Sequence, residues 1–127
     1  MGNLLRRAGI AALIAAVANV VVYFIAVQVS GPLVVTTSAP MEVTVALPFT
    51  FTLLLGIIGS SIAGMIALRT AQPQRTWVII SVVALVLYGI PPFASAGVTT
   101  AIWFNVMHAV AGICLIPAVA RVLPTTR

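Results

Sequence analysis

The chain has 127 residues, of which 62% are hydrophobic and only 6% are charged, and its mean hydropathy is +1.26. Soluble globular domains carry about 25% charged residues, so this composition excludes a soluble monomeric domain. The chain has six basic residues and a single acidic one. Because the arginines lie at the ends of hydrophobic blocks instead of along one face, the charge pattern argues against a nucleic-acid partner.

The hydrophobic residues form blocks of membrane-spanning length. A helix needs about 20 apolar residues to cross a hydrocarbon core of about 30 Å. The first block is longer than the apolar region of a signal peptide, about 7 to 15 residues, so we expect it to be retained. The sequence therefore predicts an all-α integral membrane four-helix bundle in a single transmembrane domain, residues 1–127. The expected spans are residues 8–29, 47–68, 76–92 and 100–122.

The segments between the blocks carry turn and loop signals. Residues 30–46 contain Gly31, Pro32 and Pro40 between β-branched residues, which predicts a loop with a short extended piece. Pro48 suits the first turn of the second helix, where its missing N–H costs nothing.

The third block is clear only over residues 76–90, which would cover about 22 Å at a helical rise of ~1.5 Å per residue. Pro91 and Pro92 follow. Either the helix continues past a proline kink, or the local bilayer thins. Thr99 and Thr100 are candidate caps for the last helix.

The arginines predict the orientation in the membrane. If the connectors lie alternately on the two sides, every arginine falls on one side, and neither residues 30–46 nor residues 91–98 contain a cation. Basic residues favour the cytoplasmic side, so we expect both termini to be cytoplasmic and Glu42 to lie outside. The arginines concerned are Arg6, Arg7, Arg69, Arg75, Arg121 and Arg127.

Two helices carry small residues at helical spacing. In the second block these are Gly56, Ser60 and Gly64, four residues apart, a pattern typical of close helix packing in membranes. The pattern does not say whether the contact lies within the chain or between subunits. The first block carries a similar stripe, formed by Ala8, Ala12, Ala15, Asn19, Val22 and Ala26.

Polar residues inside the spans predict a buried cluster. Asn105 and His108, with Gly112 beyond them, share one helix face, and unpaired polar groups are costly in hydrocarbon, so this face should point into protein. The cluster would either fix the register of the helices or have a function, because His108 is the side chain whose ordinary pKa is near neutral. Its expected members, mostly in the outer half of the membrane, are Asn19, Tyr23, Thr52, Tyr88, Asn105 and His108, with Glu42 folding over the top.

The residue inventory argues against catalysis and cofactors. Cys114 is the single cysteine, so an intrachain disulfide and a cysteine-rich metal site are impossible. One His, one Cys and one Glu make a poor zinc site, and haem held by two histidines would need a second chain. Paired carboxylates are absent, as is the lysine of a phosphate-binding loop. We therefore expect no enzymatic activity, no cofactor and no metal.

The second half of the chain resembles a family of small bacterial four-helix membrane proteins known only as a domain of unknown function. The resemblance covers residues 56–123 and carries no activity, but it implies a bacterial inner-membrane protein with four spans. The residues that carry it are Arg75, Thr76, Trp77, Met107, His108, Gly112, Leu115, Ile116, Pro117 and Arg121.

Two functions follow as hypotheses for this multi-pass protein of the bilayer. The first is a structural or accessory subunit that associates with itself or with other membrane proteins through the face formed by Gly56, Ser60 and Gly64. The alternative is a homo-oligomeric channel or carrier for a small solute, with a polar path near His108. The channel or carrier predicts a hydrated cavity at His108, whereas the accessory subunit predicts a dry, hydrogen-bonded seam.

Overall fold

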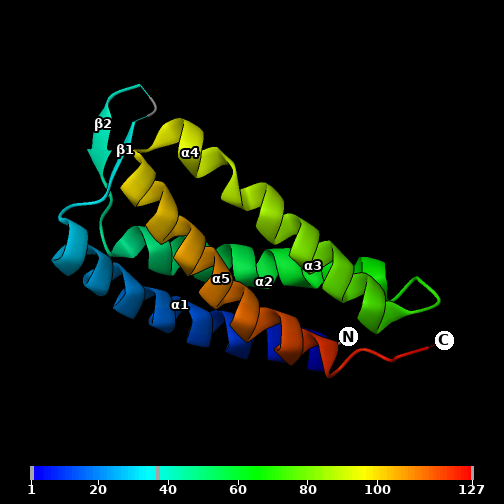
Figure 1. The fold of residues 1–127 in the computed structure, drawn as a ribbon. Coiled ribbons are helices and arrows are strands. Elements are labelled where there is room, and N and C mark those ends of the chain that lie inside the picture. Colours follow the sequence, from blue (N-terminus) through cyan, green and yellow to red (C-terminus); the bar gives the residue numbers. More distant parts are fainter. Residues whose placement is uncertain (1, 37, 127) are drawn as a thin grey trace.

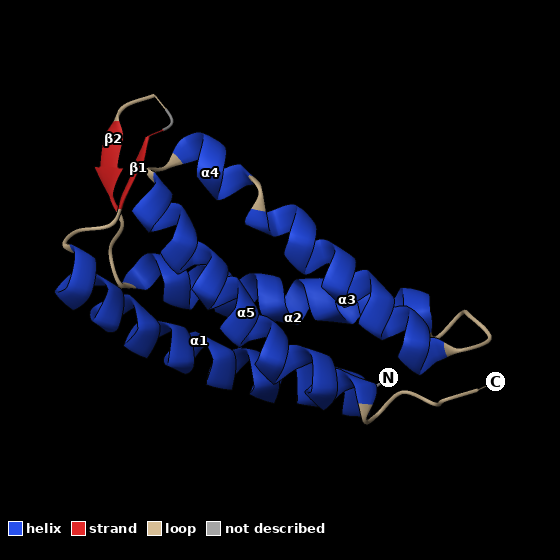
Figure 2. Ribbon diagram, in the orientation of Figure 1, coloured by secondary structure: helices blue, strands red, loops and turns tan. Residues whose placement is uncertain are grey.

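The computed structural model describes residues 2–36 and 38–126 and is predominantly helical (Figures 1 and 2). The helices are α1 (Gly2–Ser30), α2 (Ala46–Ala67), α3 (Pro73–Gly89), α4 (Pro91–Ser95) and α5 (Val98–Ala120). Strands β1 (Val34–Thr36) and β2 (Pro40–Glu42) form an antiparallel hairpin between α1 and α2. Within the described residues, four helical segments are long and apolar enough to cross a membrane, with α3 and α4 together forming the third. The predicted all-α, four-span architecture is thus confirmed.

The first and third spans begin earlier than the sequence predicted. Helix α1 starts at Gly2 instead of residue 8, and Leu4 is buried against α2, so packing extends the helix beyond the apolar block. Helix α3 starts at Pro73 instead of residue 76. Proline fits this first turn because the first amides of a helix have no partner within it.

The third span continues past its prolines, as the first of the two alternatives expected. Helix α3 ends at Gly89, Ile90 forms the junction, and α4 extends the span to Ser95. The predicted threonine caps of α5 are wrong, because Gly97 precedes its first residue and no side chain caps this end. Instead, the Thr100 hydroxyl accepts a hydrogen bond of 3.3 Å from the Val34 amide, which ties α5 to the hairpin.

Helix α1 packs along α2 and α5, whereas α3 packs mainly on α5. The stripe of small residues on α1 lies against α2, since a Cβ built on Gly56 would lie 2.9 Å from the Cβ of Ala12. Near the other end of this contact, Leu4 covers Gly64. The face formed by Gly56, Ser60 and Gly64 is therefore buried within the chain, which corrects the expectation that it is exposed for association.

The hairpin is fastened to one end of the bundle, called here the hairpin end (Figure 1). Gly31 has a φ of 78° and allows the chain to turn directly after α1. Leu33 and Val43 are fully buried, and the Tyr23 hydroxyl donates a hydrogen bond of 2.8 Å to the Val43 carbonyl. The extended piece expected in residues 30–46 is thus part of the packed structure.

The opposite end, called here the arginine end, holds both ends of the described chain (Figure 1). Its core contains Trp77, which is only 2% exposed and donates a hydrogen bond of 2.9 Å to the Ile116 carbonyl. Trp77 is therefore a packing residue that joins α3 to α5. The core cluster consists of Leu4, Ala8, Ala67, Trp77, Val119, Ala120 and Leu123.

Candidate functional site: a lateral cavity beside His108

A cavity of about 600 Å³ lies between α2, α3 and α5, and we call it the lateral cavity. It follows α2 from Leu47 to Ala63 and α3 from Trp77 to Tyr88, so it extends along most of the bundle. Most of its lining is apolar. Its polar lining residues are Asn19, Thr52, Ser60, Ser81, Tyr88 and His108.

The cavity exists because short side chains face one another across it. Helix α2 contributes Gly59 and Ala63, α3 contributes Ala84, and α5 contributes Ala111. The close glycine contacts of α2, at Gly56 and Gly64, are with α1, and α3 packs mainly on α5 instead of on α2. The sequence contains these small residues, but their pattern alone does not say which pair of helices stays apart.

The cavity opens sideways between α2 and α3. On α2, the lining residues Phe51, Leu55 and Ile58 are each more than half exposed, and so is Tyr88 on α3. Side chains that line a cavity and are also exposed stand at its mouth. Because these segments have the length and hydropathy of membrane spans, the mouth faces the level of the lipid chains.

Asn19 forms the inner wall of the cavity and joins three helices. Its Nδ2 atom donates hydrogen bonds to the Thr52 hydroxyl at 2.9 Å and to the Met107 carbonyl at 3.2 Å. Its Oδ1 atom is buried without a partner among the described residues. The Asn19 amide therefore uses its donor atom but not its acceptor atom. The two hydrogen bonds that it donates join α1, α2 and α5 near the middle of the bundle.

His108 also lines the cavity, and its Nδ1 atom is buried without a hydrogen-bond partner in the described part of the chain. An unpaired ring nitrogen is costly in an apolar environment. The arrangement differs from the dry, fully hydrogen-bonded seam that the accessory hypothesis predicts at this residue. A molecule in the cavity that carries a hydroxyl or carbonyl group would offer the imidazole a partner.

Asn105, one helical turn from His108, donates a hydrogen bond to the backbone of α3. Pro91 and Pro92 have no N–H, and the Phe93 amide bonds to Ile90, so the carbonyl of Gly89 lacks its usual helical donor. The Asn105 Nδ2 atom donates to this carbonyl at 3.1 Å and to the carbonyl of Ala101 at 2.9 Å. Asn105 therefore stabilises the proline break and does not line the cavity.

The remaining predicted residues lie apart from one another. Tyr23 is bonded to the base of the hairpin, Tyr88 is 62% exposed at the mouth, and Glu42 lies exposed on β2. The structure thus brings Asn19, Thr52, Tyr88 and His108 to one cavity and gives Tyr23 and Asn105 other partners. The expected single network, closed by Glu42, is not formed.

Metal-ligating side chains do not gather around the cavity. Within residues 2–36 and 38–126, no three His, Cys, Asp or Glu side chains come close enough to hold one ion. What the cavity offers chemically is an apolar surface with hydrogen-bonding groups at mid-height. Such a surface suits binding of a molecule through shape and one or two polar contacts.

Comparisons with curated proteins and with solved structures find no significant match to this chain. A family model does match, and it extends beyond residues 56–123, on which the resemblance in the sequence rests. Since it covers residues 1–125, the chain belongs to DUF6069, a family of unknown function.

Proposed function

We propose that this protein is a non-enzymatic membrane protein that binds and carries a small, mostly apolar molecule in the lateral cavity. The observation that carries the proposal is the cavity itself, about 600 Å³ beside the unpaired Nδ1 atom of His108. Ligand pockets commonly measure about 300–1,000 Å³ and combine apolar walls with a few polar groups. The proposal keeps the carrier idea of the second hypothesis from the sequence but differs from it in two respects. The cavity lies within one chain instead of a homo-oligomer, and its lining is mostly apolar instead of a polar path.

The mouth between α2 and α3 supports uptake from the bilayer. An apolar molecule dissolved in lipid could enter past Phe51 and Ile58 without crossing the hydrated surface. His108 would then favour a molecule with a hydroxyl or carbonyl group, because such a group can hydrogen-bond to the imidazole that lines the cavity.

For the cellular setting, we propose a bacterial inner membrane with both termini in the cytoplasm. The support is the charge pattern, because the described arginines lie at one end and the hairpin end carries no cation. The hairpin would then face the outside.

An accessory role remains a second proposal, and α3 favours it. Only 6% of the apolar window of the third span is buried within the chain, compared with 33% in the first. A helix of a second copy or of another membrane protein could cover α3 and fill the mouth of the cavity. In this version the cavity is an incomplete interface.

Mild extraction from the native membrane, followed by mass analysis of the intact particle, distinguishes the two proposals. We expect the parent to retain a small molecule that is depleted in His108→Ala and kept in Val106→Ala, a change of an exposed residue on the same helix. A stoichiometric foreign subunit without any small molecule would refute the carrier proposal and support the accessory one.

A further inference from the structure

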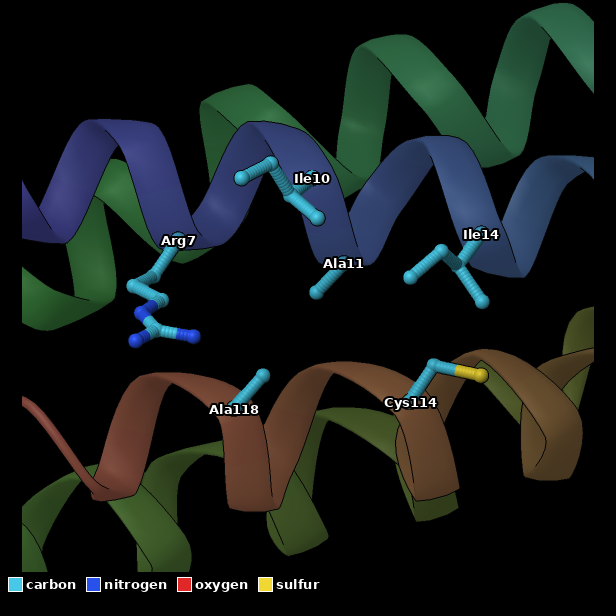
Figure 3. A pocket seen from close by; sticks show the side chains of 6 residues that line it. All are labelled: Arg7, Ile10, Ala11, Ile14, Cys114 and Ala118. Carbon is cyan, nitrogen blue, oxygen red and sulfur yellow. The ribbon is translucent and has the colours of Figure 1, made fainter.

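A second hollow lies between α1 and α5 and is separate from the lateral cavity. It measures about 170 Å³ and shares none of the residues that line the cavity. Figure 3 shows the α1 side chains on one side of the hollow and those of α5 on the other. We call it the α1–α5 groove, and its lining residues are Arg7, Ile10, Ala11, Ile14, Cys114 and Ala118.

The groove has a charged end and an apolar body. Arg7 lies nearest the arginine end, and Ile14 lies about 10 Å farther along α1 at ~1.5 Å per residue. Ala11 and Ala118 are short and leave room between the helices, whereas Ile10 and Ile14 are 47% and 57% exposed at its border. The body of the groove therefore continues into the level of the lipid chains.

No acidic side chain of this protein can neutralise Arg7. The single acid, Glu42, lies in the hairpin at the opposite end of the bundle. Figure 3 shows the Arg7 side chain extending across the groove toward α5. A guanidinium presents paired N–H donors that match the oxygens of a phosphate, so an anion attached to an apolar chain complements both ends of the groove.

We infer that the α1–α5 groove binds an anionic phospholipid, with its phosphate on Arg7 and one acyl chain between Ile14 and Ala118. A free phosphate would use only the charged end and would leave the apolar body empty. Basic residues beside grooves between membrane helices are a common setting for anionic lipids. The inference does not depend on the function proposed for the lateral cavity.

Native mass spectrometry of the full chain, supplied with phosphatidylglycerol or phosphatidylcholine of the same chain length, tests the charged end. We expect the parent to retain one phosphatidylglycerol under activation that removes phosphatidylcholine. Arg7→Gln should lower the relative affinity for phosphatidylglycerol by about tenfold, the size of one charge-assisted contact. Arg75→Gln, at the same end but outside the groove, should leave it unchanged. Equal losses of affinity for phosphatidylglycerol in Arg7→Gln and Arg75→Gln would overturn the inference. The lipid would then respond to the general positive charge of that end and not to a site at Arg7.

A second pair of variants tests the apolar body. Ala118→Phe fills the groove and keeps Arg7, so it should also abolish preferential retention. Ala109→Phe, at an exposed position of the same helix, should still bind phosphatidylglycerol in preference to phosphatidylcholine, as the parent does. The inference fails if Ala118→Phe binds phosphatidylglycerol like the parent, or if inorganic phosphate alone displaces the lipid, since either result would reduce the site to an ion contact at Arg7.

Discussion

At the scale of single residues, the space around each glycine determines what it contributes to packing. A Cβ at Gly56 would meet the Cβ of Ala12 at 2.9 Å, and both atoms are fixed to helix backbones. At Gly64 the nearest atom, at 2.8 Å, is a terminal carbon of the flexible Leu4 side chain. A Cβ at Gly59 would have no atom of another helix within 4 Å. The three glycines therefore differ, although they look alike in the sequence.

Alanine substitutions at these glycines should separate in stability. We expect Gly56→Ala to lower the free energy of unfolding by about 1–3 kcal/mol, because α1 must move to avoid overpacking. Gly64→Ala should cost less, because Leu4 can turn away, and Gly59→Ala should stay within about 0.5 kcal/mol of the parent. Unfolding measured by steric trapping in bicelles gives the three values. Equal losses would contradict the packing described for α1 and α2.

At the scale of elements, the third span depends on a hydrogen bond donated by another helix, α5. The proline break leaves the Gly89 carbonyl without its usual helical donor, and Asn105 supplies one from α5. Because Gly89 is also buried directly against Asn105, this contact joins the two helices near the hairpin end. The break is thus a fixed bend stabilised by α5.

Asn105→Leu should destabilise this junction. The variant keeps a similar volume but leaves a buried carbonyl unpaired, which costs about 1–3 kcal/mol. Hydrogen exchange of the α4 amides should accelerate while the contact between α1 and α2 stays protected. Ser95→Ala, which removes an exposed hydrogen bond to the Pro91 carbonyl, is the control and should change little. Unchanged exchange in Asn105→Leu would show that the break needs no support from α5.

The element scale also shows what the sequence could and could not predict. Helical periodicity placed Asn105, His108 and Gly112 on one inward face, and the small residues of the first two spans predicted a close helix contact. Periodicity gives a direction but no partner, so it could not show that Asn105 is committed to Gly89 or that Gly56 meets Ala12 of the same chain. The cavity depends on the angle between α2 and α3, which no local pattern encodes.

At the scale of the whole molecule, charge and polarity are separated along the bundle axis. The described arginines lie at one end, and the hairpin, which carries the single acid, lies at the other. Between them, the α1–α5 groove lies between α1 and α5, whereas the lateral cavity opens between α2 and α3, so the two face different sides of the bundle. One side would then serve a transported molecule and the other a resident lipid.

Cysteine labelling tests the proposed orientation. In a Cys114→Ala background, Ser38→Cys places a thiol in the hairpin and Gln72→Cys places one in the connector at the arginine end, both at exposed positions. In intact cells, a membrane-impermeant maleimide should label the Ser38→Cys variant and reach the Gln72→Cys variant only after permeabilisation. The reverse pattern would invert the orientation inferred from the arginines.

The central claim is that the lateral cavity takes up an apolar molecule from the bilayer. Trp77 lines the cavity but is only 2% exposed, so in a Trp103→Phe background it reports on molecules inside. With 11-bromo-1-undecanol in lipid nanodiscs, we expect strong quenching of Trp77 fluorescence. Ala84→Phe, which fills the cavity, should abolish it, and Val83→Phe, at a neighbouring position that is 51% exposed, should preserve it. Equal quenching in all three proteins, or none in the parent, would contradict uptake into the cavity.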